Sequence, residues 1–192
     1  MTRQQLIDAI EKYRPYNEQE EMDKPLILNW IKNEKDAFLR ENKIAHITAS
    51  AWVVNKDRSK VLMVYHNIYQ SWSWTGGHTD GETDFLSVAL KEAEEETGLG
   101  ALRPLSPYPV RWDVLCVKAH EKRGNPVAPH LHLNAAFVFT ADENAPLSVC
   151  PEENSAVRWL PLSSLETLCG EPFMLPIYQS LIQSAKTLLV KI

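Results

Sequence analysis

The stretch that decides the fold is residues 76–99, which read Gly-Gly-His-Thr-Asp-Gly-Glu-Thr-Asp-Phe-Leu-Ser-Val-Ala-Leu-Lys-Glu-Ala-Glu-Glu-Glu-Thr-Gly-Leu. A glycine loop leads into a segment whose apolar residues recur at helical spacing. Thr83 or Asp84 is expected to cap the start of this helix. Gly98 stands where a left-handed glycine commonly follows the last helical turn. The stretch therefore predicts an amphipathic helix that packs one face on a core.

The acidic residues of this helix are predicted to lie together. At about 100° per residue, Glu92, Glu95 and Glu96 share one arc of about 100°. Like charges at this spacing repel one another, whereas crowded oxygen ligands are what a hard cation such as Mg²⁺ needs. Gly76 and Gly77 allow the backbone to approach an ion closely, so their carbonyl groups are candidate ligands as well. The pattern predicts a metal site for phosphate chemistry, and the alternative is a solvated acidic face.

The segment resembles the Nudix box of the Nudix hydrolases. That box is a Gly, five residues, Glu, seven residues, Arg-Glu, two residues, Glu-Glu, one residue, then Gly and an aliphatic residue. Counted from Gly77 to Leu99, the chain has these in register: Lys91-Glu92, Glu95-Glu96, Gly98 and Leu99. Glu82 departs from the pattern, because it stands one residue before the early Glu position. Lys91 replaces the usual Arg, keeping the positive charge without the planar fork.

The resemblance implies an α/β/α sandwich with a mixed sheet and a hydrolase that cleaves the pyrophosphate bond of a nucleoside diphosphate linked to another group. Mg²⁺ or Mn²⁺ would be held by the three box carboxylates, with Lys91 beside them. In many Nudix proteins an acid outside the box assists the metal or the attacking water. Glu153 is the candidate for that role here, and a solvent-exposed residue without a role is the alternative.

Two other classes of protein are to be weighed against a hydrolase. Type I isopentenyl diphosphate isomerases share the fold, and His46 and His78 resemble histidines of their metal site. Those enzymes carry a catalytic Cys just before a Gly-His step, whereas Thr75-Gly76-Gly77-His78 contains none. The other class is a binding or regulatory module without turnover. Such modules usually show broken box carboxylates, and all three are present here.

His130 and His132 are candidates for substrate binding. They alternate along a predicted strand and therefore face the same side. They are expected to face the substrate cleft as a polar pair or to have a structural role. A metal bound by these histidines is a third interpretation, but no Cys or carboxylate partner lies at a diagnostic spacing.

Trp74 and a basic segment are further candidates for substrate binding. Residues 118–126 read Lys-Ala-His-Glu-Lys-Arg-Gly-Asn-Pro, and Lys118, His120 and Lys122 are suited to binding phosphate oxygens. An ordinary solvated loop is the equal alternative. Trp74 lies just before the glycine loop, and its ring is expected either to stack on a base or to pack in the core.

Length and composition favour one soluble domain with an N-terminal extension. The chain has 192 residues, which we divide into a helical extension, 1–42, and a hydrolase domain, 43–192. The net charge of -5 argues against a nucleic-acid-binding surface. The three cysteines show no paired spacing, as expected of free thiols in the cytoplasm. No apolar stretch is long enough for a membrane span. The resemblance implies a small-molecule nucleoside diphosphate derivative as the partner.

The remaining elements follow from periodicity. Two helices are expected in the extension, one closed by Pro15 and one from about Pro25 to Arg40. They are expected either to pack on the core or to form a homodimer contact. Strands are expected at His46–Val54, Lys60–His66, Val110–Ala119, His130–Thr140 and Ser155–Leu160, and a final helix at about Met174–Lys191.

Overall fold

The computed structural model describes residues 2–122 and 124–188 of the chain. Its central element is strand β1 (Ala45–Asn55), and every residue of that strand is buried. Such complete burial requires that both faces of the sheet be covered. The strand order is β10-β2-β1-β9-β5, and β3, β4 and β6 pair with β2, β1 and β9 respectively. β1 and β9 run parallel and the other pairs are antiparallel, so the predicted mixed sheet is confirmed.

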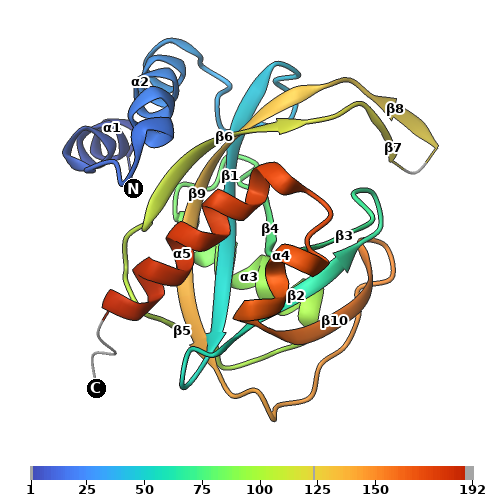
Figure 1. Cartoon of the computed structure of the whole chain (residues 1–192). Coiled ribbons are helices and arrows are strands. Elements are labelled where there is room, and N and C mark those ends of the chain that lie inside the picture. The colour runs from blue at the N-terminus through green and yellow to red at the C-terminus, as the bar shows by residue number, and fades with distance from the viewer. Residues whose placement is uncertain (1, 123, 189–192) are drawn as a thin grey trace.

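The strands expected from the sequence are present, with small shifts at their ends. The remaining strands of the sheet are β2 (Lys60–His66), β3 (Ser71–Ser73), β4 (Thr75–His78), β5 (Arg103–Pro104), β6 (Arg111–Val117), β9 (His130–Ala141) and β10 (Asn154–Pro161). The basic segment is not a plain loop. It forms a separate hairpin of β7 (His120–Lys122) and β8 (Asn125–Val127), which projects beyond the sheet (Figure 1). Arg123 of this segment lies outside the described residues.

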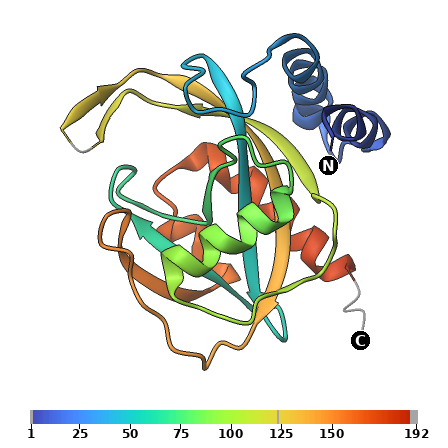
Figure 2. The same ribbon diagram turned by 180° about the vertical axis from the view of Figure 1, so that it is seen from behind.

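Helices cover the two faces of the sheet. α5 (Leu175–Thr187) lies on one face and α3 (Phe85–Thr97) on the other (Figures 1 and 2). Successive side chains of β1 point to opposite faces. Ala49 therefore packs in the core on the α3 side, whereas Trp52 packs on the α5 side. The α/β/α sandwich is confirmed, and the short helices η1 (Leu162–Ser164), α4 (Leu165–Leu168) and η2 (Pro172–Met174) lead into α5.

The ends of α3 and α5 lie close to the positions expected from the sequence. Asp84, one of the two expected residues, caps α3 by accepting the backbone N–H of Ser87. Gly98 follows the helix with a φ of 65°, which is the left-handed conformation predicted for it. α5 begins one residue later than expected and ends at Thr187, and residues 189–191 at the end of the predicted helix lie outside the described residues.

The N-terminal extension contains α1 (Arg3–Lys12) and α2 (Glu18–Asn33). The prediction of a second helix from about Pro25 to Arg40 is wrong at both ends, because α2 begins at Glu18, has Pro25 inside it and ends at Asn33. Asn17 caps the earlier start by accepting the N–H of Glu20. Packing of α2 on β6 offsets the hydrogen bond that proline cannot donate. None of the described helices has the length and apolar character that crossing a membrane requires.

Buried charges join the extension to the sheet. The Arg111 guanidinium on β6 lies 3.2 Å from a Glu20 carboxylate oxygen and also binds Asp113. The N–H of Val114 donates to Asp23 at 3.0 Å. Burial of these groups is tolerated because they are paired. α2 thus packs on the core of its own chain (Figure 1).

Candidate active site

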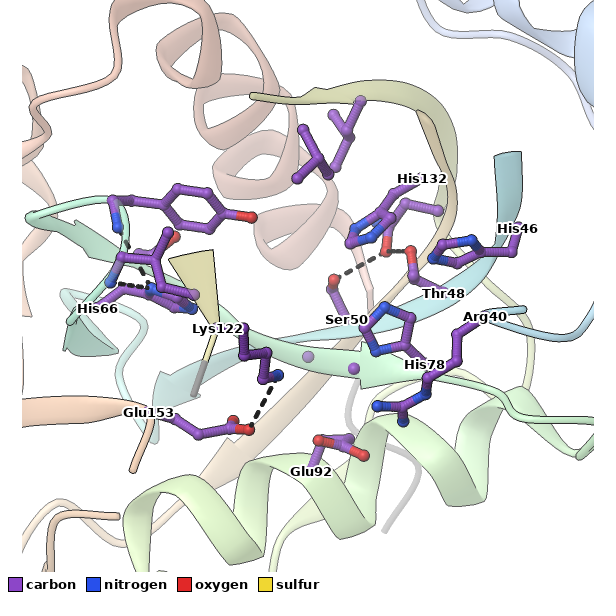
Figure 3. Close-up of a pocket in the computed structure, with 18 of the residues that line it drawn as sticks. Arg40, His46, Thr48, Ser50, His66, His78, Glu92, Lys122, His132 and Glu153 are labelled. Atoms are coloured by element: carbon purple, nitrogen blue, oxygen red, sulfur yellow. Dashed lines mark hydrogen bonds and ion pairs between the residues drawn. The ribbon is translucent and has the colours of Figure 1, made fainter. Parts of the chain in front are cut away.

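A cleft of about 1340 Å³ opens between α3, the end of the sheet and the β7–β8 hairpin. Figure 3 shows a close-up of this cleft. Most residues singled out in the sequence line it: Trp74, Gly76, Gly77, Lys91, Glu92, Glu95, Glu96, His120, Lys122, His130, His132 and Glu153. Lys118 is exposed and lies outside this lining. Residues far apart in sequence therefore meet at one surface.

Three carboxylates gather at the α3 side of the cleft. One oxygen each from Glu92, Glu96 and Glu153 lies within 4.8 Å of the other two. Glu92 and Glu96 are one turn apart on α3, and Glu153 comes from the turn before β10. Gly76 donates its N–H to Glu96 at 2.8 Å. A Cβ atom at Gly77 would lie 2.3 Å from the carboxylate carbon of Glu92, so only glycine allows this approach.

The carboxylates are costly to hold together without a cation. Burial raises the pKa of Glu96 to about 8, and the charges of Glu153 and Glu92 add to this, whereas the Gly76 N–H lowers it. Burial also raises the pKa of Glu92, followed by repulsion from Glu153 and Glu95. Glu96 is only 3% exposed. Crowded oxygen donors with raised pKa values fit a hard divalent cation, whose charge would favour their ionised forms.

Glu95 and Lys91 lie at the rim of the cleft rather than in this cluster. Both side chains are mostly exposed, and the Lys91 ammonium lies 3.6 Å from a Glu95 oxygen. The sequence predicted Glu95 beside Glu92 and Glu96. Helical spacing indicates the direction of the three carboxylates, but the position of β4 decides which of them face the glycines. Glu92 and Glu96 face them, and Glu153 joins this pair.

Two cationic side chains approach the carboxylates. The Lys122 ammonium lies 3.9 Å from Glu153, which ties the hairpin to the acidic cluster. The Arg40 guanidinium is held by Asp80, with Nε donating to Oδ1 at 2.7 Å, and its charge offsets a small part of the rise that burial causes in the pKa of Glu92. Figure 3 shows Lys122 and Arg40 reaching toward Glu92 from different sides. Sequence reasoning missed Arg40, because it lies in an irregular segment before β1.

Four histidines form a second cluster in the cleft. Neighbouring rings among His46, His78, His130 and His132 have centroids 4.9–5.1 Å apart. His46 is opposite His132 in the parallel pairing of β1 with β9, and His78 ends β4. Burial lowers the pKa of His78 to about 3 and lowers the pKa values of His46 and His132 as well. These three rings are therefore neutral at pH 7.

The floor of the cleft is polar. Thr48 and Ser50 both donate to the Oδ1 atom of Asn134, at 3.0 and 2.8 Å. Thr48 and Ser50 follow His46 at every second residue of β1 and therefore face the same side, a signal that the sequence analysis did not use. The Trp74 ring is 8% exposed and packs edge-on against Tyr178, which leaves little of its face for a base.

Known proteins share this architecture. Residues 45–181 match a family model described as NUDIX domain, and no curated protein matches the chain significantly. A similar solved structure is a C. elegans Ap4A hydrolase binary complex, with a TM-score of 0.54 and 14% identity over 73% of this chain and 97% of that chain. Another is the NUDIX domain of Shewanella oneidensis NrtR complexed with ADP ribose, with a TM-score of 0.53 and 14% identity over 82% and 97%.

A third similar structure is the E. coli dihydroneopterin triphosphate pyrophosphohydrolase, with a TM-score of 0.54 and 13% identity over 72% of this chain and 95% of that chain. Identities this low show a shared fold and no more. The family match is the stronger finding, because it spans most of the chain and includes the glycine loop and the whole of α3. The chain belongs to the Nudix family of pyrophosphohydrolases.

Proposed function

We propose that the protein is a Mg²⁺- or Mn²⁺-dependent hydrolase that cleaves the pyrophosphate bond of a nucleoside diphosphate linked to another group. The observation that carries this proposal is the cluster of Glu92, Glu96 and Glu153 against the glycines of β4. Carboxylate oxygens at this density are ligands for a hard cation. Glu95 and the carbonyl groups of Gly76 and Gly77 are retained as further candidate ligands.

The described side chains suggest how a pyrophosphate would be bound and cleaved. A cation bound at the cluster would neutralise phosphate oxygens and lower the pKa of a water molecule. Arg40 and Lys122 would contact the remaining phosphate oxygens through charge-assisted hydrogen bonds. Glu153 is partly exposed to the cleft, so it is our candidate for accepting the proton of the attacking water.

The cleft also offers contacts to the rest of the substrate. Tyr69 and Phe173 are exposed rings that line it, and either is better placed than Trp74 to stack on a base. The Nδ2 atom of Asn134 is buried without a partner among the described residues, so it can donate to a substrate oxygen. The compounds named with the similar structures, Ap4A, ADP ribose and dihydroneopterin triphosphate, all join a phosphate chain to a ring system. They support this substrate class.

Turnover of a substrate panel tests the proposal. Tag-free protein is incubated with ADP-ribose, nucleotide sugars, dinucleoside polyphosphates and nucleoside triphosphates, with Mg²⁺ or with excess chelator. We expect hydrolysis of at least one class, its loss with chelator and its return with Mg²⁺. Undiminished hydrolysis in chelator would contradict the metal assignment. Binding without turnover, seen as a thermal shift worth about 2.7 kcal/mol at 100 times the dissociation constant, would favour a silent module.

Other expectations about the protein are carried as proposals. The cytoplasm is the proposed location, which the free thiols of Cys116, Cys150 and Cys169 support. Residues 1–42 are proposed as an extension of the domain formed by 43–192, and nucleic acid is not a proposed partner. A homodimer through the extension would need a surface other than the one that α2 already presents to β6.

A further inference from the structure

We propose that His46, His130 and His132 bind a second metal ion, a borderline transition metal such as Zn²⁺, at a site separate from the carboxylates. One ring nitrogen of each lies within 4.8 Å of the other two. Imidazole ligands suit Zn²⁺, Co²⁺ and Ni²⁺, whereas carboxylate ligands suit Mg²⁺ and Mn²⁺. The two clusters of this cleft would therefore select different ions. The inference does not depend on the proposed hydrolase activity.

The parallel pairing of two strands assembles the three ligands. His46 is opposite His132 in the register of β1 with β9. His130 is two residues before His132 and projects from the same face. Strand alternation grouped only the pair on β9, which is too few ligands for zinc, and nothing in the sequence placed His46 beside that pair. The third nitrogen comes from β1, and the fold supplies it.

Hydrogen bonds at the far side of two rings indicate where their lone pairs point. The Nδ1 atoms of His46 and His130 lie 2.9 Å from the carbonyl oxygens of Asn42 and Ala128. A carbonyl oxygen only accepts, so each Nδ1 carries a hydrogen, and in the neutral form of either ring the lone pair is on Nε2. This is the arrangement that orients metal-binding histidines in proteins.

Within the described part of the chain, the hydrogen bonds of the metal-free protein leave one buried nitrogen of His46 unpaired. Its side chain is 3% exposed, and its Nε2 atom is buried with no hydrogen-bond partner among the described residues. Buried polar atoms in native structures nearly always have partners, because an unpaired one loses its contacts with water. A metal ion shared with His130 and His132 would satisfy this nitrogen.

The spacing of the other two nitrogens suits a shared ion. The Nε2 atoms of His130 and His132 lie 3.2 Å apart, and without a metal they are hydrogen-bonded to one another. Two nitrogens at about 2.0–2.1 Å from one tetrahedral ion are separated by about 3.3–3.4 Å. Both side chains are partly exposed, so an ion can enter from the cleft. His78 borders the site, with its ring centroid 4.9 Å from that of His46. Three protein ligands and one open position are typical of catalytic zinc sites.

Metal analysis of the full-length, tag-free protein tests this inference. The protein is loaded with Zn²⁺ in the presence of excess Mg²⁺, dialysed, and its zinc content measured. Titration with Co²⁺ followed by visible absorption reports the ligand geometry. We expect one zinc per chain and a tetrahedral Co²⁺ spectrum. Substituting His132→Ala should weaken zinc binding at least about 100-fold, since even losing a supporting contact costs 10–100-fold.

Two controls separate this site from the rest of the cleft. His120→Ala removes a histidine that lines the cleft outside the cluster, and Glu92→Gln removes a carboxylate of the Mg²⁺ site. Both should keep the zinc. Because His46 is buried and its replacement can unfold the chain, His130→Ala serves as the second ligand variant, with melting in chelator as the folding check. Substoichiometric zinc in the parent, zinc retained in both ligand variants, or zinc lost with Glu92→Gln would overturn the inference.

Discussion

Gly77 on β4 and Glu92 on α3 are fitted to one another, since a Cβ atom at residue 77 would lie 2.3–2.7 Å from the carbon and both oxygens of the Glu92 carboxylate. Real Cβ atoms essentially never lie this close to a neighbouring side chain, so the missing side chain decides where this carboxylate lies. Gly76 positions the carboxylate on the next turn of α3, because its backbone N–H donates a hydrogen bond to Glu96. The glycine pair therefore positions two of the three clustered carboxylates.

Gly77→Ala should abolish most turnover without unfolding the protein. The added methyl group would displace the end of a flexible glutamate side chain, and a misplacement of about 1 Å can cost 100-fold in rate. Turnover, the Mg²⁺ dependence of the rate and the melting temperature are to be measured. Gly100→Ala is the matched control, because a Cβ atom there meets nothing within 4 Å. Turnover of Gly77→Ala within twofold of the parent would contradict the proposed role of Glu92.

The pKa of Glu96 predicts how the stability of the metal-free protein depends on pH. Folding raises this pKa from 4.5 to about 8, so the folded state prefers the protonated carboxyl group. The stability that this group contributes is full below about pH 4.5 and is lost as the pH rises through about 8. In chelator, Glu96→Gln should therefore be increasingly more stable than the parent between pH 5 and pH 8.

Melting temperatures of the two proteins across this pH range check that prediction. Glu94→Gln is the control, because Glu94 is exposed on the same helix. Its melting curve should follow that of the parent at every pH. If Glu96→Gln also runs parallel to the parent from pH 5 to pH 8, then Glu96 is not the buried, repelled carboxyl group described above.

Glu95 and Glu153 should differ in their effect on the rate. Sequence spacing alone predicts equal losses for Glu95 and Glu96, whereas the structure places Glu153 in the cluster and Glu95 at the rim. Glu153→Gln should lower kcat at least about 100-fold, which corresponds to about 2.7 kcal/mol of transition-state stabilisation. Glu95→Gln should lower it less than about 10-fold. The reverse order in steady-state kinetics would favour Glu95 over Glu153 as the third carboxylate ligand.

Arg40 should contribute to substrate binding from the N-terminal segment. Its guanidinium is held by Asp80 and its charge reaches Glu92, so it is positioned for a phosphate oxygen. Arg40→Ala should lower kcat/KM by about 10–100-fold, in line with the loss of a charge-assisted hydrogen bond of about 1.5–3 kcal/mol. Arg58→Ala, which removes an arginine outside the cleft, is the control. Equal kinetics for the two variants would exclude Arg40 from the site.

The extension should be part of the folding unit. Glu20 is fully buried, lies 3.2 Å from Arg111 and accepts the Tyr13 hydroxyl. Breaking a buried ion pair from one side costs about 3–5 kcal/mol, so Glu20→Gln should lower the free energy of unfolding by up to that amount. Glu21→Gln, an exposed neighbour, should change it little. Urea denaturation measures both, and equal midpoints would mean that the helices pack loosely on β6.

Local sequence was sufficient for most elements. The caps of α3 at Asp84 and Gly98 and the strand β1 follow from preferences and interactions of residues close in the chain. Pro25 was misread for the same reason: a local rule places proline at the start of a helix, but packing against β6 holds it inside α2. Local rules fail where a contact from a distant element outweighs a backbone preference.

The sequence by itself determined the acidic helix, because its periodicity, its caps and the glycine loop all lie within a few residues of one another. The fold class came from the resemblance of this segment to the Nudix box. Only the tertiary structure decided which groups meet in the cleft. The position of β4 against α3 selects Glu92 and Glu96 and excludes Glu95 from the cluster. The register of β1 with β9 brings His46 to His132. Such contacts depend on how separate elements dock, and spacing along one element does not encode that geometry.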